Sequence, residues 1–239
     1  MRLSGKIALI TGGSRGIGKE IAGMLAREGS VVVICARNAG ELRETASAIA
    51  RAGGKCMFRE TDVTVEEQVN VLVRDILGRY GRLDILVNNA GVGIYKPLTE
   101  SSTEDWEKVM NTNLKGAFYC AKASASVMMA QRSGIIVNVA SGAGKEGFAN
   151  LSIYCASKFG LLGLTDSLSK ELRGYGIDVL AVTPGYTRTS FFKTFPASFR
   201  MRSSAQEPCE VARQVLIKIF ASGKITAKVV RFAKEKIWT

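Results

Sequence analysis

The residues best suited to chemistry in this chain are a tyrosine and a lysine four positions apart. Tyr154 and Lys158 lie in a segment with helical spacing, and Ser141 precedes the tyrosine by thirteen residues. The 239 residues include no histidine, so proton transfer near neutral pH has to use another group. Because residues four apart share a helix face and a nearby ammonium favours the phenolate, Lys158 is expected to lower the pKa of Tyr154. The pair predicts a tyrosine acid or base.

A glycine-rich turn near the amino terminus indicates what this proton chemistry would serve. Residues Thr11–Gly18 read Thr-Gly-Gly-Ser-Arg-Gly-Ile-Gly and follow an apolar strand pattern. Gly12, Gly16 and Gly18 would let a pyrophosphate approach backbone amides where a helix begins. A glycine turn alone is often only structural, but a position between a strand and a helix is typical of a dinucleotide site.

The end of the second expected strand favours one dinucleotide over the other. A site that prefers NAD(H) usually carries an acidic residue there, whereas this chain has Ala36 and Arg37. Together with Arg15 of the glycine turn, Arg37 suits a ribose 2′-phosphate, which takes charge-assisted hydrogen bonds from guanidinium groups. The pattern predicts NADP(H), and the alternative is that both arginines are ordinary surface charges.

Strand-like and helix-like segments alternate along the whole chain. Strands are expected at Lys6–Thr11, Val31–Ala36, Lys55–Glu60, Leu83–Val87, Ile135–Val139, Ile177–Val182 and Ile225–Val230. Helices are expected at Gly16–Glu28, Glu41–Ala52, Thr64–Arg79, Thr103–Ala130, Ile153–Arg173 and Glu207–Ala221. Thr64 and Glu67 form a capping-box pattern. The alternation predicts an α/β fold: a single Rossmann-type domain over residues 1–239, with a doubly wound parallel sheet of about seven strands and helices on both faces.

Further motifs follow in order along the chain. They are Asp62-Val63 after the third strand, Asn88-Asn89-Ala90-Gly91 after the fourth, Asn113 in Asn-Thr-Asn-Leu, and Pro184-Gly185 after the sixth. With the glycine turn and the tyrosine pair, they resemble the classical short-chain dehydrogenase/reductase family from Lys6 to about Ala221. Within that family, the chain looks most similar to the 3-oxoacyl-(acyl carrier protein) reductases and related ketoreductases.

The resemblance implies roles for four residues. Tyr154 would be the general acid that protonates a carbonyl oxygen, and Lys158 would lower its pKa and hold the nicotinamide ribose. Ser141 would hydrogen-bond the substrate carbonyl, and Asn113 would hold a water in a proton relay. Taken alone, each residue is more often an ordinary helix or turn residue, and only their joint occurrence behind the glycine turn favours the functional roles.

The resemblance also implies a set of cofactor contacts. They are Gly12, Ser14, Arg15, Gly16, Ile17, Gly18, Arg37, Asp62, Val63, Asn89, Ala90, Gly91, Tyr154, Lys158, Pro184, Gly185, Thr187 and Thr189. For Asp62, the role would be to accept from the adenine amino group, and capping the next helix is the alternative.

The expected activity is reduction of a ketone, 3-oxoacyl thioester-like or another carbonyl, to a secondary alcohol with NADPH. One alternative is an alcohol, steroid or sugar dehydrogenase on the same scaffold. Another, of a different class, is a dinucleotide-sensing or nucleic-acid-associated protein without catalysis. The intact set of four residues argues against lost catalysis.

The segment 186–207 is expected to form a lid over the substrate. It contains Phe191, Phe192, Phe195 and Phe199, which indicate either an apolar pocket wall or the packing of a short helix. Basic residues in the same segment could meet an acidic carrier protein or a phosphopantetheine; they are Lys193, Arg200 and Arg202. However, the chain lacks the Asp-Gly-Gly ending usual in carrier-protein reductases, which puts the carrier and the usual tetramer contacts in doubt.

Composition narrows the classes of partner and the compartment. The net charge is +12, but no basic run interleaved with aromatic residues indicates nucleic-acid binding, and a basic surface explains the excess. Five scattered cysteines form no Cys-x-x-Cys pattern, so neither a metal site nor disulfides are expected. With no signal-peptide pattern or apolar membrane span, we expect a cytoplasmic homo-oligomer, a dimer or tetramer, without membrane contact.

Overall fold

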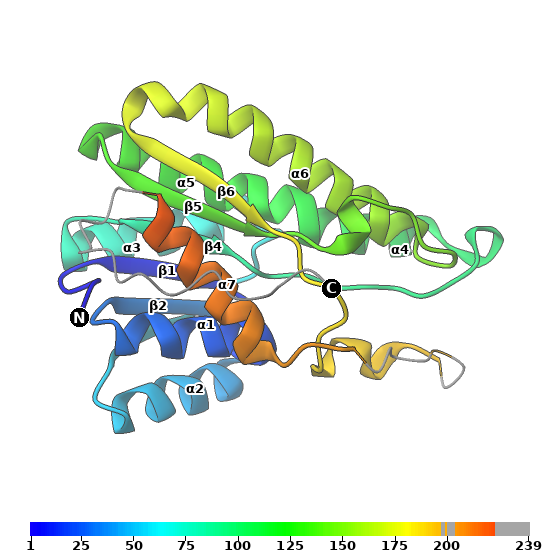
Figure 1. The fold of residues 1–239 in the computed structure, drawn as a ribbon, viewed down its shortest axis with the longest axis horizontal. Coiled ribbons are helices and arrows are strands. Elements are labelled where there is room, and N and C mark those ends of the chain that lie inside the picture. Colours follow the sequence, from blue (N-terminus) through cyan, green and yellow to red (C-terminus); the bar gives the residue numbers. More distant parts are fainter. Residues whose placement is uncertain (197–198, 200–203, 223–239) are drawn as a thin grey trace.

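The centre of the fold is a parallel sheet of six strands, ordered β3-β2-β1-β4-β5-β6 (Figure 1). The computed structural model describes residues 1–196, 199 and 204–222. The strands are β1 Ile7–Thr11, β2 Val31–Ala36, β3 Lys55–Glu60, β4 Ile85–Asn88, β5 Gly134–Val139 and β6 Ile177–Val182. This order confirms the predicted Rossmann-type fold, in which ligands bind where the strand order reverses, here between β1 and β4. The expected seventh strand, Ile225–Val230, lies outside the described residues.

Helices cover both faces of the sheet. They are α1 Gly16–Arg27, α2 Ala39–Arg51, α3 Glu66–Tyr80, α4 Thr103–Met110, α5 Gly116–Gln131, α6 Ser152–Leu172 and α7 Pro208–Ala221. Shorter helical segments are η1 Leu98–Glu100, η2 Asn111–Lys115, η3 Gly142–Gly144, η4 Arg173–Tyr175 and η5 Ser190–Thr194. Helices α1, α2 and α7 pack on one face, and α3, α5 and α6 pack on the other (Figure 1).

The strand sequences explain why the sheet is buried on both faces. Along β1, Ala8 and Ile10 join the core under α1, α2 and α7, while Ile7 and Leu9 join the opposite core. Successive side chains of a strand point to opposite faces, so a strand between two helical layers must be apolar throughout. All five residues of β1 are accordingly buried.

The predicted capping box before α3 is wrong. Helix α3 begins at Glu66. Its N-cap residue is Val65, whose side chain makes no hydrogen bond to the helix. The Thr64 hydroxyl instead donates to Asp62 Oδ1 at 2.8 Å, and Glu67 pairs with Arg74 at 2.7 Å. The N-cap is therefore Val65, whose side chain has no oxygen to accept from a helix amide, and Thr64 lies one residue before it.

The long helix predicted from Thr103 onward changes its winding in the middle. Between α4 and α5, residues Asn111–Lys115 form one π-helical turn, η2. Such turns are rare and occur mostly at functional sites. This one contains Asn113, whose side chain is buried.

The segment after β6 crosses the end of the sheet before α7. Thr187 forms a parallel bridge with Gln206, so the described ends of this segment lie side by side. Between them η5 carries Phe191 and Phe192. In the part of the chain that the structure describes, no helix is both long and apolar enough to span a bilayer.

Candidate active site

A cavity of about 600 Å³ opens at the carboxyl ends of the central strands. Most of the residues predicted as functional line it: Gly12, Ser14, Arg15, Gly16, Ile17, Arg37, Val63, Asn89, Ala90, Gly91, Ser141, Tyr154, Lys158, Pro184, Gly185, Thr187 and Thr189. They come from both halves of the chain, because parallel strands present their carboxyl ends at one edge. Gly18, Asp62 and Asn113 do not line it.

The glycine turn leaves the amides at the start of α1 available to a ligand. The N-cap residue Arg15 makes no side-chain hydrogen bond to the helix, and the first turn carries no acidic residue. Gly12 and Gly16 have φ angles of 62° and 53°, which favour glycine. A Cβ at Gly18 would collide with the Gly12 carbonyl oxygen. The turn therefore fits a dinucleotide pyrophosphate, which such free amides bind.

The loop after β4 is hydrogen-bonded to this turn. Thr11 Oγ1 accepts from the backbone amides of Asn89 and Ala90, both at 3.0 Å. In return, Asn89 Nδ2 donates to Thr11 O at 2.9 Å and to Gly12 O at 3.2 Å. The motif after the fourth strand thus holds the two central loops of the cavity together.

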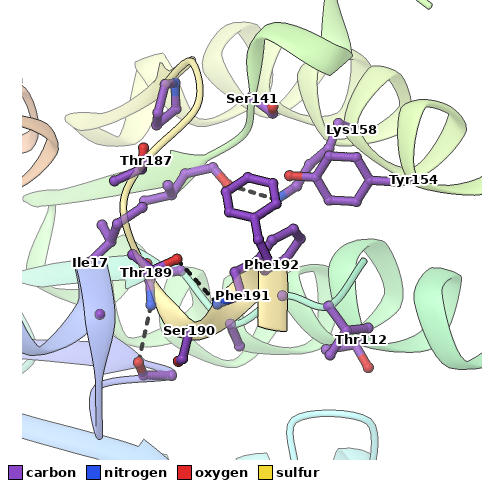
Figure 2. Close-up of a pocket in the computed structure, with 18 of the residues that line it drawn as sticks. Ile17, Thr112, Ser141, Tyr154, Lys158, Thr187, Thr189, Ser190, Phe191 and Phe192 are labelled. Atoms are coloured by element: carbon purple, nitrogen blue, oxygen red, sulfur yellow. Dashed lines mark hydrogen bonds between the residues drawn. The ribbon is translucent and has the colours of Figure 1, made fainter. Parts of the chain in front are cut away.

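Tyr154 and Lys158 project from one face of α6 toward Ser141 (Figure 2). The Lys158 side chain is almost fully buried, with 4% of its surface exposed, and its Nζ donates to Val139 O at 2.9 Å. The same Nζ lies 5.7 Å from the centre of the Tyr154 ring. The spacing of four residues therefore brings the two groups into one site, as predicted.

The pKa of Tyr154 does not follow the sequence-based expectation. Burial raises the pKa of Tyr154 to about 12, although the hydrogen bond with Ser141 acts in the lowering direction. Burial also lowers the pKa of Lys158 to about 8. The lysine charge alone would lower the pKa of Tyr154. Burial removes solvent, however, and so disfavours the charged form of both groups. At neutral pH the phenol keeps its proton and most of the lysine stays charged.

Ser141 stands where β5 meets the short turn η3. Its Oγ accepts from the Ala143 amide at 3.1 Å, which leaves the hydroxyl proton for another acceptor. The Gly142 amide donates to Pro184 O at 2.9 Å, so the loops after β5 and β6 are joined beside the serine. Ser141 can therefore donate to an oxygen atom in the cavity.

Asn113 lies beneath the cavity wall and holds it in place. Its Oδ1 accepts from the Val92 amide at 2.8 Å, and its Nδ2 donates to Val92 O at 2.9 Å and to Ser157 Oγ at 3.0 Å. Both amide hydrogens are thus used within the protein. Any water held by this side chain would use the second lone pair of Oδ1.

Aromatic residues of the lid segment stand against the tyrosine. The ring centres of Tyr154 and Phe191 are 5.6 Å apart, and Phe192 follows at 5.2 Å from Phe191. Figure 2 shows both phenylalanines projecting from the lid segment into the cavity near Tyr154. Phe195 is buried in the same cluster. Of the basic lid residues predicted to meet a carrier, Lys193 is exposed, and Arg200 and Arg202 lie outside the described residues.

Sequence reasoning missed several lining residues, above all Glu41. Its Oε2 accepts from Ser14 Oγ at 2.9 Å, and its Oε1 lies 3.4 Å from Arg15 Nη1. Glu41 was expected only as the start of a helix, and no sequence signal placed it beside the glycine turn. Thr112, Glu146 and Ser190 also line the cavity. Among the described residues, no group of side chains is arranged to hold a metal ion.

Comparisons with known proteins agree with this arrangement. A family model described as short chain dehydrogenase matches residues 6–198. A 3-oxoacyl-[acyl-carrier-protein] reductase of Thermotoga maritima is 37% identical over 226 residues, covering 90% of this chain and 91% of the relative. A metagenomic short-chain oxidoreductase in complex with NADP has a TM-score of 0.81 and 35% identity, covering 91% of both chains. A short chain dehydrogenase/reductase from Burkholderia phymatum in complex with NAD has a TM-score of 0.86 and 29% identity, covering 93% of this chain and 88% of the other.

Proposed function

Because this chain belongs to the short-chain dehydrogenase family, we propose that it is an oxidoreductase that reduces a ketone to a secondary alcohol with NADPH. One observation carries the proposal. Tyr154, Lys158 and Ser141 line the same cavity as a glycine turn whose helix amides are free to bind a pyrophosphate.

The proton would come from Tyr154. Since its pKa of about 12 keeps the phenol neutral at pH 7, it can donate to the carbonyl oxygen as negative charge develops there. The Ser141 hydroxyl would donate a second hydrogen bond to the same oxygen. Bound NADPH would supply the hydride. The charged Lys158 beside the ring would then stabilise the phenolate as its proton leaves, and Asn113 Oδ1 would hold a water for reprotonation.

Tyr154 would serve both directions of the reaction, as an acid in reduction and as a base in oxidation. Burial favours the protonated phenol, which is the form that reduction uses. The net direction follows from the concentrations of the two cofactor forms and of ketone and alcohol, because a catalyst lowers the barrier equally for both.

The preference for NADPH rests on two arginines. Arg15 and Arg37 border the cavity at the end of β2, where a ribose 2′-phosphate would lie. Relatives of similar fold have been solved with NADP and with NAD, so the family accommodates both. The remaining proposed contacts are those of the glycine turn, the loop after β4 and the segment from Pro184 to Thr189, with Asp62 at the adenine end.

The substrate is proposed to be a ketone with an apolar substituent. Phe191, Phe192 and Phe195 line the cavity beside Tyr154. Away from the glycine turn, the end of β2 and α2, Lys158 and Glu146 are the only charged residues in the described lining. If a carrier presents this ketone, turnover of the carrier-bound form should exceed that of its minimal thioester at low salt and lose this advantage at high salt. Equal efficiency at both salt concentrations would exclude the carrier.

We place the enzyme in the cytoplasm as a homo-oligomer. All five cysteines are free thiols in the structure, which suits a reducing compartment. The same setting supplies reduced nicotinamide cofactors. No nucleic-acid partner is proposed, since the +12 charge is explained as a basic surface.

The test is NADPH oxidation across a panel of ketones, with wild type and Tyr154→Phe. We expect turnover of at least one apolar ketone by the wild type and a loss of about a hundredfold or more in Tyr154→Phe. The variant should still bind NADPH, measured by the change in cofactor fluorescence. Tight NADPH binding by the wild type without turnover of any ketone would instead favour a dinucleotide sensor.

A further inference from the structure

Helix α2 contacts the glycine turn through two residues one helical turn apart. Thr45 Oγ1 donates to Ser14 O at 2.8 Å, and Glu41 Oε2 accepts from Ser14 Oγ at 2.9 Å. The second carboxylate oxygen of Glu41 lies 3.4 Å from Arg15 Nη1. Ser14 is thus held by its backbone and by its side chain, and Glu41 contacts the side chains of both Ser14 and Arg15.

Stabilisation of α2 does not account for these contacts. Glu41 lies in the first turn of α2, where an acidic residue favours the helix through its dipole. That effect needs no contact with a segment 26 or 27 residues away. The Glu41 side chain is 33% exposed and lines the cavity, as Arg37 and Asn38 do. Its carboxylate therefore lies in the region where the proposed function requires the 2′-phosphate of NADP(H) to bind.

We propose that Glu41 sets the cofactor preference by competing with the 2′-phosphate of NADP(H) for the Ser14 hydroxyl and the Arg15 guanidinium. A phosphate and a carboxylate accept from the same donors, and two anions at one place repel each other. NAD(H) carries a 2′-hydroxyl there, which can donate to Glu41 without conflict. The site then prefers NADP(H) less strongly than Arg15 and Arg37 alone would make it, and it also accepts NAD(H). This inference rests on the proposed dinucleotide site.

The test isolates the 2′-phosphate from the rest of the cofactor. Adenosine 2′,5′-bisphosphate and 5′-AMP differ only in that group, and titration calorimetry gives the dissociation constant of each. Glu41→Gln removes the charge but keeps an oxygen that can accept from Ser14. We expect it to bind the bisphosphate about tenfold more tightly, which is about 1.4 kcal/mol, and 5′-AMP as the wild type does.

Glu44→Gln is the matched control. It removes the same charge from an exposed position on the same helix that does not line the cavity, so both constants should stay within about twofold of wild type. Glu41→Ala also removes the acceptor for a 2′-hydroxyl. It should therefore weaken NADH binding severalfold while tightening NADPH binding, both read from cofactor fluorescence. Thermal melts establish that each variant is folded.

The outcomes separate this inference from the proposed function. A ratio of bisphosphate to 5′-AMP affinity that is unchanged in Glu41→Gln overturns the role of Glu41, while measurable NADPH binding leaves the proposed enzyme intact. A wild type that binds neither nucleotide nor NADPH overturns the dinucleotide site and this inference with it. A change in Glu44→Gln equal to that in Glu41→Gln would mean that general helix charge, rather than the contact with Ser14 and Arg15, sets the ratio.

Discussion

Lys158 is a charged residue that the folded chain holds in an unfavourable environment. Its side chain is 4% exposed, and burial lowers its pKa from an ordinary value of 10.5 to about 8. Below pH 8 the folded protein keeps a buried ammonium, at a cost of about 3 kcal/mol relative to the solvated group. Such a cost is expected at a catalytic position, where function requires a charge that stability disfavours.

Replacing this lysine should therefore stabilise the protein while removing its activity. We expect Lys158→Met to raise the free energy of unfolding at pH 7 by about 1–3 kcal/mol, because no charge remains to be buried. Wild type loses its penalty as pH rises from 8 toward 10.5, since the unfolded state binds more protons than the folded state in that window. The advantage of the variant should shrink over the same window. Urea unfolding at pH 7 and pH 10 measures both effects, and a gain independent of pH would contradict the burial argument.

Arg37 should decide whether a 2′-phosphate is tolerated at the end of β2. We expect Arg37→Asp to raise the Michaelis constant for NADPH by about tenfold or more and to improve the use of NADH, because a cation that suits the phosphate becomes an anion that suits a ribose hydroxyl. Arg43→Asp is the control, since Arg43 is exposed and does not line the cavity. Steady-state kinetics with both cofactors gives the comparison, and an unchanged preference in Arg37→Asp would disprove the assignment.

At the scale of elements, the junction of β1 with α1 leaves no room for a side chain at Gly18. A Cβ at Gly18 would meet the Gly12 carbonyl oxygen and the Asn89 side chain, whereas a Cβ at Gly23 on the same helix would meet nothing within 4 Å. Gly18 therefore allows helix α1 to approach the glycine turn. Gly23 has no such role, and its flexibility only weakens the helix interior.

The two alanine substitutions in α1 should have opposite effects. Gly18→Ala should destabilise the protein by about 2 kcal/mol or more and weaken NADPH binding, because backbone atoms must shift to admit the methyl group. Gly23→Ala should stabilise it by about 0.5–1 kcal/mol and leave NADPH binding unchanged. Thermal melts and cofactor titrations on the pair test this, and equal effects of the two substitutions would refute it.

At the scale of the whole molecule, three large aromatic side chains stand in solvent on neighbouring helices. Trp106 on α4, Phe118 on α5 and Phe159 on α6 are 48%, 42% and 47% exposed. Helices α4 and α5 both contact α6. In the proposed homo-oligomer, an interface formed by these helices would bury all three side chains.

A charge placed among these residues should weaken the assembly. We expect the wild type to elute with the mass of a dimer or tetramer in size-exclusion chromatography with light scattering, and Phe118→Glu to shift toward the monomer, since burial of a carboxylate is unfavourable. Arg43→Glu on α2, an exposed position on the other side of the sheet, serves as the charge-change control. A wild type that is monomeric at micromolar concentration would contradict the proposal.

The sequence by itself determined the features that depend on local pattern. Apolar runs of strand length and helical spacing predicted the positions of all six described strands and of the helices between them, because periodicity records which faces are buried. The glycine turn and the spacing of Tyr154 and Lys158 predicted the two ends of the cavity, since each depends on residues a few positions apart. The order of the motifs along the chain indicated the short-chain dehydrogenase family.

The tertiary structure decided what depends on distant neighbours and on solvent. The contact of Glu41 with Ser14 joins residues 27 positions apart, and no local pattern encodes it. The predicted capping box is wrong because helix α3 begins one residue later than the pattern indicates, with Val65 rather than Thr64 at the N-cap. The pKa of Tyr154 moved upward because the fold removes water around the ring, whereas spacing shows only that a lysine is near. Burial and long-range contact are properties of the folded chain, so they appear only once the sheet has brought the loops together.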